Sequence, residues 1–209
     1  MLTKYPDHII TIDDFKDFSI KERNSVFTGQ VYHCEKEDEV SKLLIDVKKK
    51  FYDATHHCYA YKFIDGKFKY SDDGEPNGTA GIRILNAIEH FNLTNVIVIV
   101  IRYYGGIKLG VGPLGKAYYA AAFNTLNKAN KIYKHHYQKI TIKSGFNYTD
   151  LIHKVLSNNK AIIVNSGYKK LAIYECLVMP SKFDAVQKKL LNSSKGEIKI
   201  DCQDEHYYQ

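Results

Sequence analysis

Two segments of this chain combine charged side chains with glycines, a combination that is typical of binding loops. The first, residues 71–83, sets three carboxylates around a glycine. The second, residues 101–119, holds five glycines among one arginine and two lysines. Glycine suits positions where φ is positive or where the backbone must approach another group closely. Because the two segments flank the apolar stretch VIVIVI at 96–101, we expect them to meet at one end of a sheet.

The chemistry expected of such a site is the binding of a polyanion. Helix N-termini bind anions through free N–H groups and the helix dipole, and a predicted helix follows each glycine loop. An aromatic ring beside a basic residue can stack on a base. The predicted phosphate- or nucleic-acid-binding residues are Gly78, Thr79, Arg102, Tyr103, Gly105, Gly106, Lys108 and Lys116. The predicted acidic wall, which would order the basic side chains, consists of Asp53, His56, Asp72, Asp73 and Glu75.

The second segment also resembles two nucleotide-binding fingerprints without matching either. Residues 110–115 fit GxGxxG, but eight residues separate them from the preceding strand and no acidic residue follows at the required distance. A dinucleotide site needs both features. Lys116 extends the match toward a phosphate-binding loop, yet Ala117 stands where the magnesium-binding hydroxyl belongs. We therefore predict neither a dinucleotide site nor an NTPase.

Catalytic alternatives are weaker. Grouped carboxylates can bind a divalent cation or divide acid and base roles, so a metal-dependent phosphoester hydrolase using residues 72–75 is an alternative function. No HExxH or EF-hand spacing supports it. Cys58 follows two histidines, but it alternates along a predicted strand, which favours a buried structural cysteine. We predict no catalytic residue, no metal and no cofactor.

Composition fits a cytoplasmic protein without a membrane span. The 209 residues contain no run of 18 apolar residues, and the N-terminus is too polar for a signal peptide. The four cysteines lie far apart, which indicates reduced thiols. The net charge is +7, and residues 131–209 alone carry 13 lysines against 7 carboxylate side chains. Such a basic excess indicates either an anionic partner or a lysine-rich solubilising surface.

The spacing of apolar residues predicts an α+β protein with two domains, 1–136 and 137–209. In the first domain we predict a hairpin over 18–34 with Arg23-Asn24 in its turn, and two strands over 57–71 joined by Asp65-Gly66. We also predict three helices, over 37–53, 80–91 and 116–130. From residue 137 the pattern reads β-α-β-β-α-β, which is the ferredoxin-like arrangement.

Three stretches resemble the YigZ/IMPACT family: FYDATHHCYAY at 51–61, YSDDGEPNGTAG at 70–81 and TNVIVIVIRYYGGIKLGVGPLGKAY at 94–118. The resemblance implies an N-terminal domain like domain two of ribosomal protein S five, with helices on one face of a sheet, followed by a ferredoxin-like domain. Eukaryotic relatives are linked to translational control. Two departures concern the site, because His57 and Lys116 stand where the family usually has asparagine and arginine. Lysine lacks the planar fork of arginine.

From these observations we predict a non-enzymatic, translation-associated regulator that binds RNA, the ribosome or a translation factor. A protein-binding module without nucleic acid is a further alternative. If RNA is the partner, affinity should fall steeply with salt.

Overall fold

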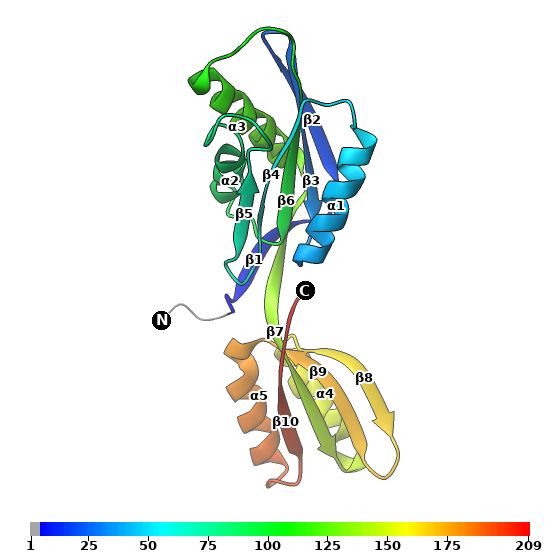
Figure 1. The fold of residues 1–209 in the computed structure, drawn as a ribbon. Coiled ribbons are helices and arrows are strands. Elements are labelled where there is room, and N and C mark those ends of the chain that lie inside the picture. Colours follow the sequence, from blue (N-terminus) through cyan, green and yellow to red (C-terminus); the bar gives the residue numbers. More distant parts are fainter. Residues whose placement is uncertain (1–4) are drawn as a thin grey trace. The chain divides into compact units, whose positions relative to one another are not determined.

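The computed structural model describes residues 5–209, and it shows an α+β protein (Figure 1). The chain divides into two units. The N-terminal unit is Ile10–Tyr133; the C-terminal unit is Lys134–Gln209 together with the described residues up to Ile9. The sequence placed a domain boundary after residue 136. That segment belongs to strand β7, Lys131–Ser144, which continues through the predicted boundary without a loop.

The N-terminal unit is built on a five-stranded antiparallel sheet. Its strand order is β2-β3-β6-β4-β5, and the predicted turn residues connect the hairpins. Arg23 and Asn24 both have positive φ between β2 and β3, and Gly66 has positive φ between β4 and β5. The strands are β2 (Lys16–Glu22), β3 (Ser25–His33), β4 (His56–Lys62), β5 (Phe68–Ser71) and β6 (Val96–Tyr103).

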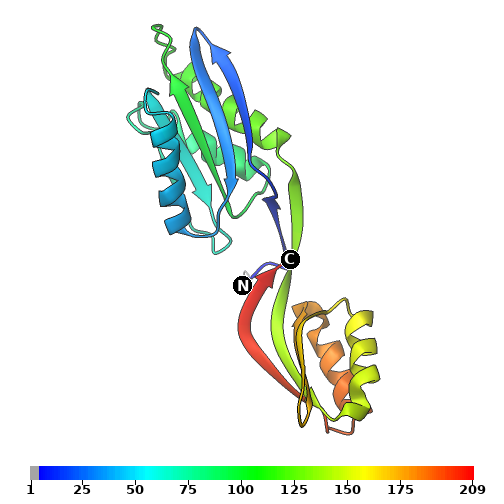
Figure 2. The ribbon, with the colours of Figure 1, turned by 90° about the vertical axis from the view of Figure 1, so that its right-hand side faces the viewer.

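Helices cover both faces of this sheet, whereas the family resemblance implied one face. Helices α2 (Gly81–His90) and α3 (Val111–Lys128) lie on one face, and α1 (Glu37–Lys50) lies on the other (Figure 2). The sequence of β6 explains the difference. Its valines pack toward α2 and α3, its isoleucines pack toward α1, and all six residues of 96–101 are fully buried. A strand covered on both faces is continuously apolar.

Helix α3 begins earlier than the sequence predicted. We expected residues 110–115 to form a loop, but the helix starts at Val111 and runs for 18 residues. Gly110 precedes it with φ of +81°. Gly112 and Gly115 are therefore helical, so the near-match to a phosphate-binding loop is not a loop at all.

The C-terminal unit has the order of helices and strands that the sequence predicted from residue 137 onward. Its sheet runs β7-β9-β8, with β10 paired to β7; β1, which also pairs with β7, has its last three residues in the N-terminal unit. The β7–β9, β8–β9 and β7–β10 pairs are antiparallel. The elements besides β7 are β1 (His8–Ile12), η1 (Phe146–Tyr148), α4 (Thr149–Asn158), β8 (Ile162–Tyr168), β9 (Ala172–Val178), α5 (Pro180–Ser193) and β10 (Lys199–Tyr208).

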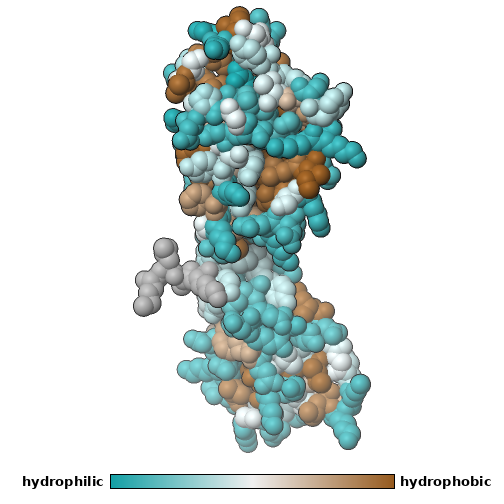
Figure 3. All heavy atoms as spheres, in the orientation of Figure 1, coloured by the Kyte–Doolittle hydropathy of each residue, from teal (hydrophilic) through white to brown (hydrophobic). Residues whose placement is uncertain are grey.

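One face of the surface can be followed in Figure 3. On the face seen in Figure 3, hydrophilic residues dominate and apolar residues form separate patches. In the part of the chain that the structure describes, no helix is both long and apolar enough to cross a bilayer.

The four cysteines differ sharply in their surroundings, and this leads to a first prediction. Cys34, Cys58 and Cys176 are buried, whereas Cys202 is exposed. Burial raises the pKa of Cys34 and of Cys176 to about 12, and it also raises the pKa of Cys58. These three thiols therefore stay protonated at pH 8. Since the thiolate is the reactive form, they should react slowly. We expect a disulfide reagent to modify Cys202 alone in the native protein and all four cysteines in denaturant. The variant Cys202→Ser should lose the fast reaction, and fast modification of a second thiol in that variant would contradict the prediction.

Candidate functional site

The loop after β5 is organised by Asp72. Its carboxylate accepts hydrogen bonds from the backbone N–H groups of Gly78, Ala80 and Gly81, at 2.9, 2.9 and 2.8 Å. These donors lie at the start of α2, whose own N-cap residue supplies no side-chain cap. Asp72 thus caps the helix from across the loop, which satisfies donors that would otherwise lack partners.

This capping changes the role expected of two predicted binding residues. The N–H of Gly78 already donates to Asp72. The Thr79 hydroxyl donates to the Pro76 carbonyl at 2.6 Å, and Thr79 is 1% exposed. These two predicted donors therefore serve the loop itself.

Asp73 fastens the same loop to its neighbours. Its carboxylate accepts from the backbone N–H of His57 at 2.6 Å and from the Lys48 ammonium at 3.0 Å. The Asp73 carbonyl lies 2.8 Å from Nδ1 of His56. Since a carbonyl only accepts, Nδ1 of His56 carries a proton. The other ring nitrogen, Nε2, then faces Oε1 of Glu75 at 3.8 Å.

Glu75 is the centre of a buried polar network. Its Oε1 accepts from Nη1 of Arg102 at 2.5 Å and from the Tyr118 hydroxyl at 2.7 Å. The Cys58 thiol donates to the Asp72 carbonyl at 3.0 Å, and its sulfur lies 3.3 Å from the Tyr118 hydroxyl oxygen. Burial raises the pKa of Tyr118, so the hydroxyl stays protonated and donates to Glu75. The network joins the loop to β4, β6 and α3.

Arg102 has an incomplete set of partners. Its side chain is 6% exposed, and its guanidinium carbon lies 5.2 Å from the Phe27 ring centroid and 5.4 Å from that of Tyr104. Nη2 donates to Ser25 at 3.4 Å. Nε is buried and has no hydrogen-bond partner among the residues of 5–209. A buried donor without an acceptor is rare and calls for an explanation.

The two charged segments do converge, at the end of β6. They line a cavity of about 460 Å³, which we call the β6 cavity. One wall comes from the region around β4 and the loop after β5, and the other comes from β6, the loop after it and the start of α3. The lining residues are Thr55, His56, Glu75, Pro76, Arg102, Tyr104, Lys108, Leu109, Gly110, Val111 and Leu114.

The groups free to act in this cavity are positive. Lys108 is exposed and forms no ion pair with any described residue. Gly110 provides no side-chain cap for α3, and the first turn of that helix holds no acidic residue. Glu75 supplies the only carboxylate in the lining, and Arg102 pairs with it. The cavity thus offers an ammonium, a helix N-terminus and a partly satisfied guanidinium.

Two predicted site residues lie on the other face of the sheet. Tyr103 packs in the cluster beneath α1, and its hydroxyl donates to Asp53 at 2.8 Å. Side chains alternate along a strand, so Tyr103 points away from the cavity that Arg102 lines. The exposed ring of Tyr104 lines the cavity instead. Of the two adjacent tyrosines, Tyr104 lines the β6 cavity and Tyr103 does not. Alternation along the strand is the sequence signal that distinguishes them.

Glycine serves two different purposes after β6. A Cβ on Gly105 would lie 2.1 Å from the backbone carbonyl carbon of Asn24, so this glycine permits close packing against the β2–β3 turn. Gly106 has φ of +82° in open space. Neither glycine lines the β6 cavity.

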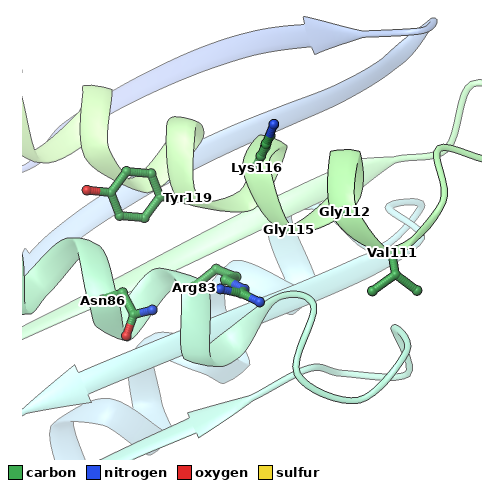
Figure 4. A pocket seen from close by; sticks show the side chains of 7 residues that line it. All are labelled: Arg83, Asn86, Val111, Gly112, Gly115, Lys116 and Tyr119. Atoms are coloured by element: carbon green, nitrogen blue, oxygen red, sulfur yellow. The ribbon is translucent and has the colours of Figure 1, made fainter.

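The remaining predicted residue, Lys116, lies outside the β6 cavity. It belongs to α3 and lines a second cavity, of about 510 Å³, between α2 and α3 (Figure 4). Arg83, Asn86 and Tyr119, which the sequence did not single out, lie there as well. Their separation by about 30 residues in the chain left no local pattern to find.

The acidic residues do not assemble into a metal centre. Within residues 5–209, no three histidine, cysteine or acidic side chains gather where they could hold a metal ion. Asp72 and Asp73 direct their oxygens to backbone N–H groups and to Lys48, as described above. The oxygens of Asp72 and Asp73 are therefore already occupied by donors of the protein itself.

Comparison with known proteins agrees with the motifs. The family model of the Impact N-terminal domain matches residues 23–126. The chain is similar to IMPACT family member YvyE of Bacillus subtilis, with 26% identity over 90% of this chain and 89% of that protein. It is also similar to IMPACT family member YigZ of Escherichia coli, with 27% identity over 85% and 89%. A crystal structure of a hypothetical protein shares the fold, with a TM-score of 0.68, 24% identity, and coverage of 96% of this chain and 99% of that one. The chain belongs to the IMPACT family.

Proposed function

We propose that this protein is a non-enzymatic, translation-associated regulator that binds RNA, with a phosphate group of the RNA held in the β6 cavity. The observation that carries the proposal is the convergence of Lys108, the start of α3 and the buried guanidinium of Arg102 around one cavity. A phosphate group accepts from all three kinds of donor.

The unpartnered Nε of Arg102 is explained by this proposal. Arg102 lines the cavity, and its Nη1 and Nη2 already donate to Glu75 and Ser25. A phosphate oxygen would provide an acceptor that the described residues do not. Glu75 fixes the guanidinium in place, so binding would order few additional groups.

The exposed ring of Tyr104 gives the cavity a second feature of RNA-binding sites. One face of the ring lies toward the Arg102 guanidinium, and the ring is 44% exposed. An exposed aromatic ring beside cations can stack on an unpaired base. The link of eukaryotic relatives to translational control, which the family resemblance implies, makes cytoplasmic RNA of the translation machinery the favoured partner.

The variant Lys108→Ala tests the proposal. We expect it to weaken binding of a fluorescent single-stranded RNA and to lower the slope of log affinity against log salt by about 0.7, the effect of one phosphate contact. Fluorescence anisotropy at several salt concentrations measures both quantities. The control is Lys42→Ala, which removes the same charge from the exposed face of α1 on the other side of the sheet.

Two outcomes would overturn the proposal. One is equal binding by the wild type and both variants. The other is retention of a translation protein that survives ribonuclease and high salt, which would identify a protein-binding module instead.

A further inference from the structure

The cavity between α2 and α3, which we call the interhelical cavity, has the composition of a second nucleotide site. Arg83 and Asn86 come from α2, and Lys116 and Tyr119 come from α3 (Figure 4). The Lys116 side chain points away from α2, so this lysine lies at the rim (Figure 4). The lining contains no carboxylate; the other lining residues are Val111, Gly112 and Gly115.

The cationic side chains of this cavity are available to bind a ligand. Neither Arg83 nor Lys116 forms an ion pair with a residue that the structure describes, and both are exposed. A Cβ at Gly115 would lie 3.3 Å from Nε of Arg83, so the guanidinium lies directly against α3 at this glycine. The helix surface therefore leaves room for the arginine fork, which suits a phosphate group.

The interhelical cavity also provides an aromatic ring. Tyr119 is half-buried and packs beside Phe123, with ring centroids 5.8 Å apart. This contact holds the ring, which borders the cavity. A ring fixed beside an arginine is the arrangement on which bases stack.

The two cavities adjoin at the start of α3. Val111 lines both of them. Its neighbours Gly110 and Gly112 have no side chain, and a Cβ at either position would meet no atom within 4 Å. The exposed side chain of Val111 is therefore flanked on both sides by positions without side chains. A strand leaving one cavity can cross the first turn of α3 and enter the other.

We infer that the two cavities hold successive nucleotides of one single strand of RNA, which passes over the start of α3. This inference rests on the proposed function and names its ligand class. Each cavity pairs an aromatic ring with a cation, Tyr104 with Lys108 and Tyr119 with Arg83. In a duplex the bases are stacked on one another, so their faces cannot reach rings that line cavities. The site therefore selects single strands.

The experiment compares a ten-nucleotide single-stranded RNA with the duplex of the same sequence, using the full chain. We expect the wild type to prefer the single strand by at least tenfold. Tyr119→Leu should weaken single-strand binding about tenfold through loss of stacking. Arg83→Ala should lower the salt slope by about 0.7. Tyr52→Leu is the matched control, because Tyr52 is 83% exposed and follows α1 on the other face of the sheet.

The outcomes separate this inference from the proposed function. If Lys108→Ala weakens RNA binding while Arg83→Ala and Tyr119→Leu do not, the inference is overturned and the proposed function stands. Equal affinity for the duplex also overturns the inference alone. If no variant changes RNA binding, both the inference and the proposed function are overturned. Urea unfolding of each variant ensures that a loss of binding is not a loss of folding, and Tyr119→Phe, which keeps the ring, should restore affinity.

Discussion

Replacing Arg102 with methionine is expected to lower the free energy of unfolding by about 3–5 kcal/mol, the range for removing one partner of a buried ion pair. Methionine fills a similar volume, so the loss is mainly electrostatic. The Glu75 side chain is 4% exposed and would keep only the Tyr118 hydroxyl as a close donor. A buried carboxylate that loses its counter-charge is strongly destabilising. Urea denaturation followed by circular dichroism measures the change.

The double variant Glu75→Gln/Arg102→Met shows whether the pair itself is responsible. It removes both charges, and glutamine can still accept from Tyr118, so we expect the double variant to be more stable than Arg102→Met alone. Lys62→Met is the control for an exposed ion pair, since Lys62 meets Glu89 at 2.8 Å with the Glu89 side chain 48% exposed. That change should cost less than about 1 kcal/mol. An Arg102→Met protein as stable as the wild type would contradict the buried network.

The second large effect is expected from Asp72→Ala, which should lower the free energy of unfolding by about 2–4 kcal/mol. Three backbone N–H groups lose a charged acceptor at once, and each such bond contributes about 1.5–3 kcal/mol before non-additivity is considered. Asp72→Asn keeps one acceptor oxygen and should lose about half as much. Urea unfolding measures both variants.

Hydrogen exchange locates the cause of this loss. The amides of Gly78, Ala80 and Gly81 should exchange faster in Asp72→Ala, whereas amides within β6 should change only as far as global stability changes. Unchanged exchange at these three amides would show that Asp72 does not cap α2. Because Asp72 supports the loop, a binding defect in this variant is not evidence of a contact to RNA.

The acidic and basic walls of the site therefore have different roles. The acidic residues Asp72, Asp73 and Glu75 hold the backbone and fix Arg102, whereas Lys108 and Arg83 remain without ion-pair partners among the described residues. Substitutions in the first group act on stability first. Substitutions in the second group are the direct tests of binding.

The α+β class and most of the helices and strands follow from sequence patterns. The apolar run at 96–101 identified the central strand, because only a strand covered on both faces avoids polar positions. The turn residues Arg23-Asn24 and Asp65-Gly66 identified two hairpins, since asparagine and glycine accept the positive φ that Asn24 and Gly66 adopt. Local chemistry of this kind depends on neighbours in the chain, so a sequence pattern is sufficient to find it.

Tertiary structure alone decided which charges are free. Glu75 and Arg102 are 27 residues apart, and no sequence spacing indicates that they pair. Tyr103 and Tyr104 are adjacent, yet they face different sides of the sheet because β6 continues through Tyr103. Helix α3 begins at Val111, five residues before the predicted start at residue 116, so Gly112 and Gly115 are helical. These outcomes depend on contacts between distant segments, which form only when the whole sheet assembles, and for that reason the interhelical cavity could not be found in the sequence.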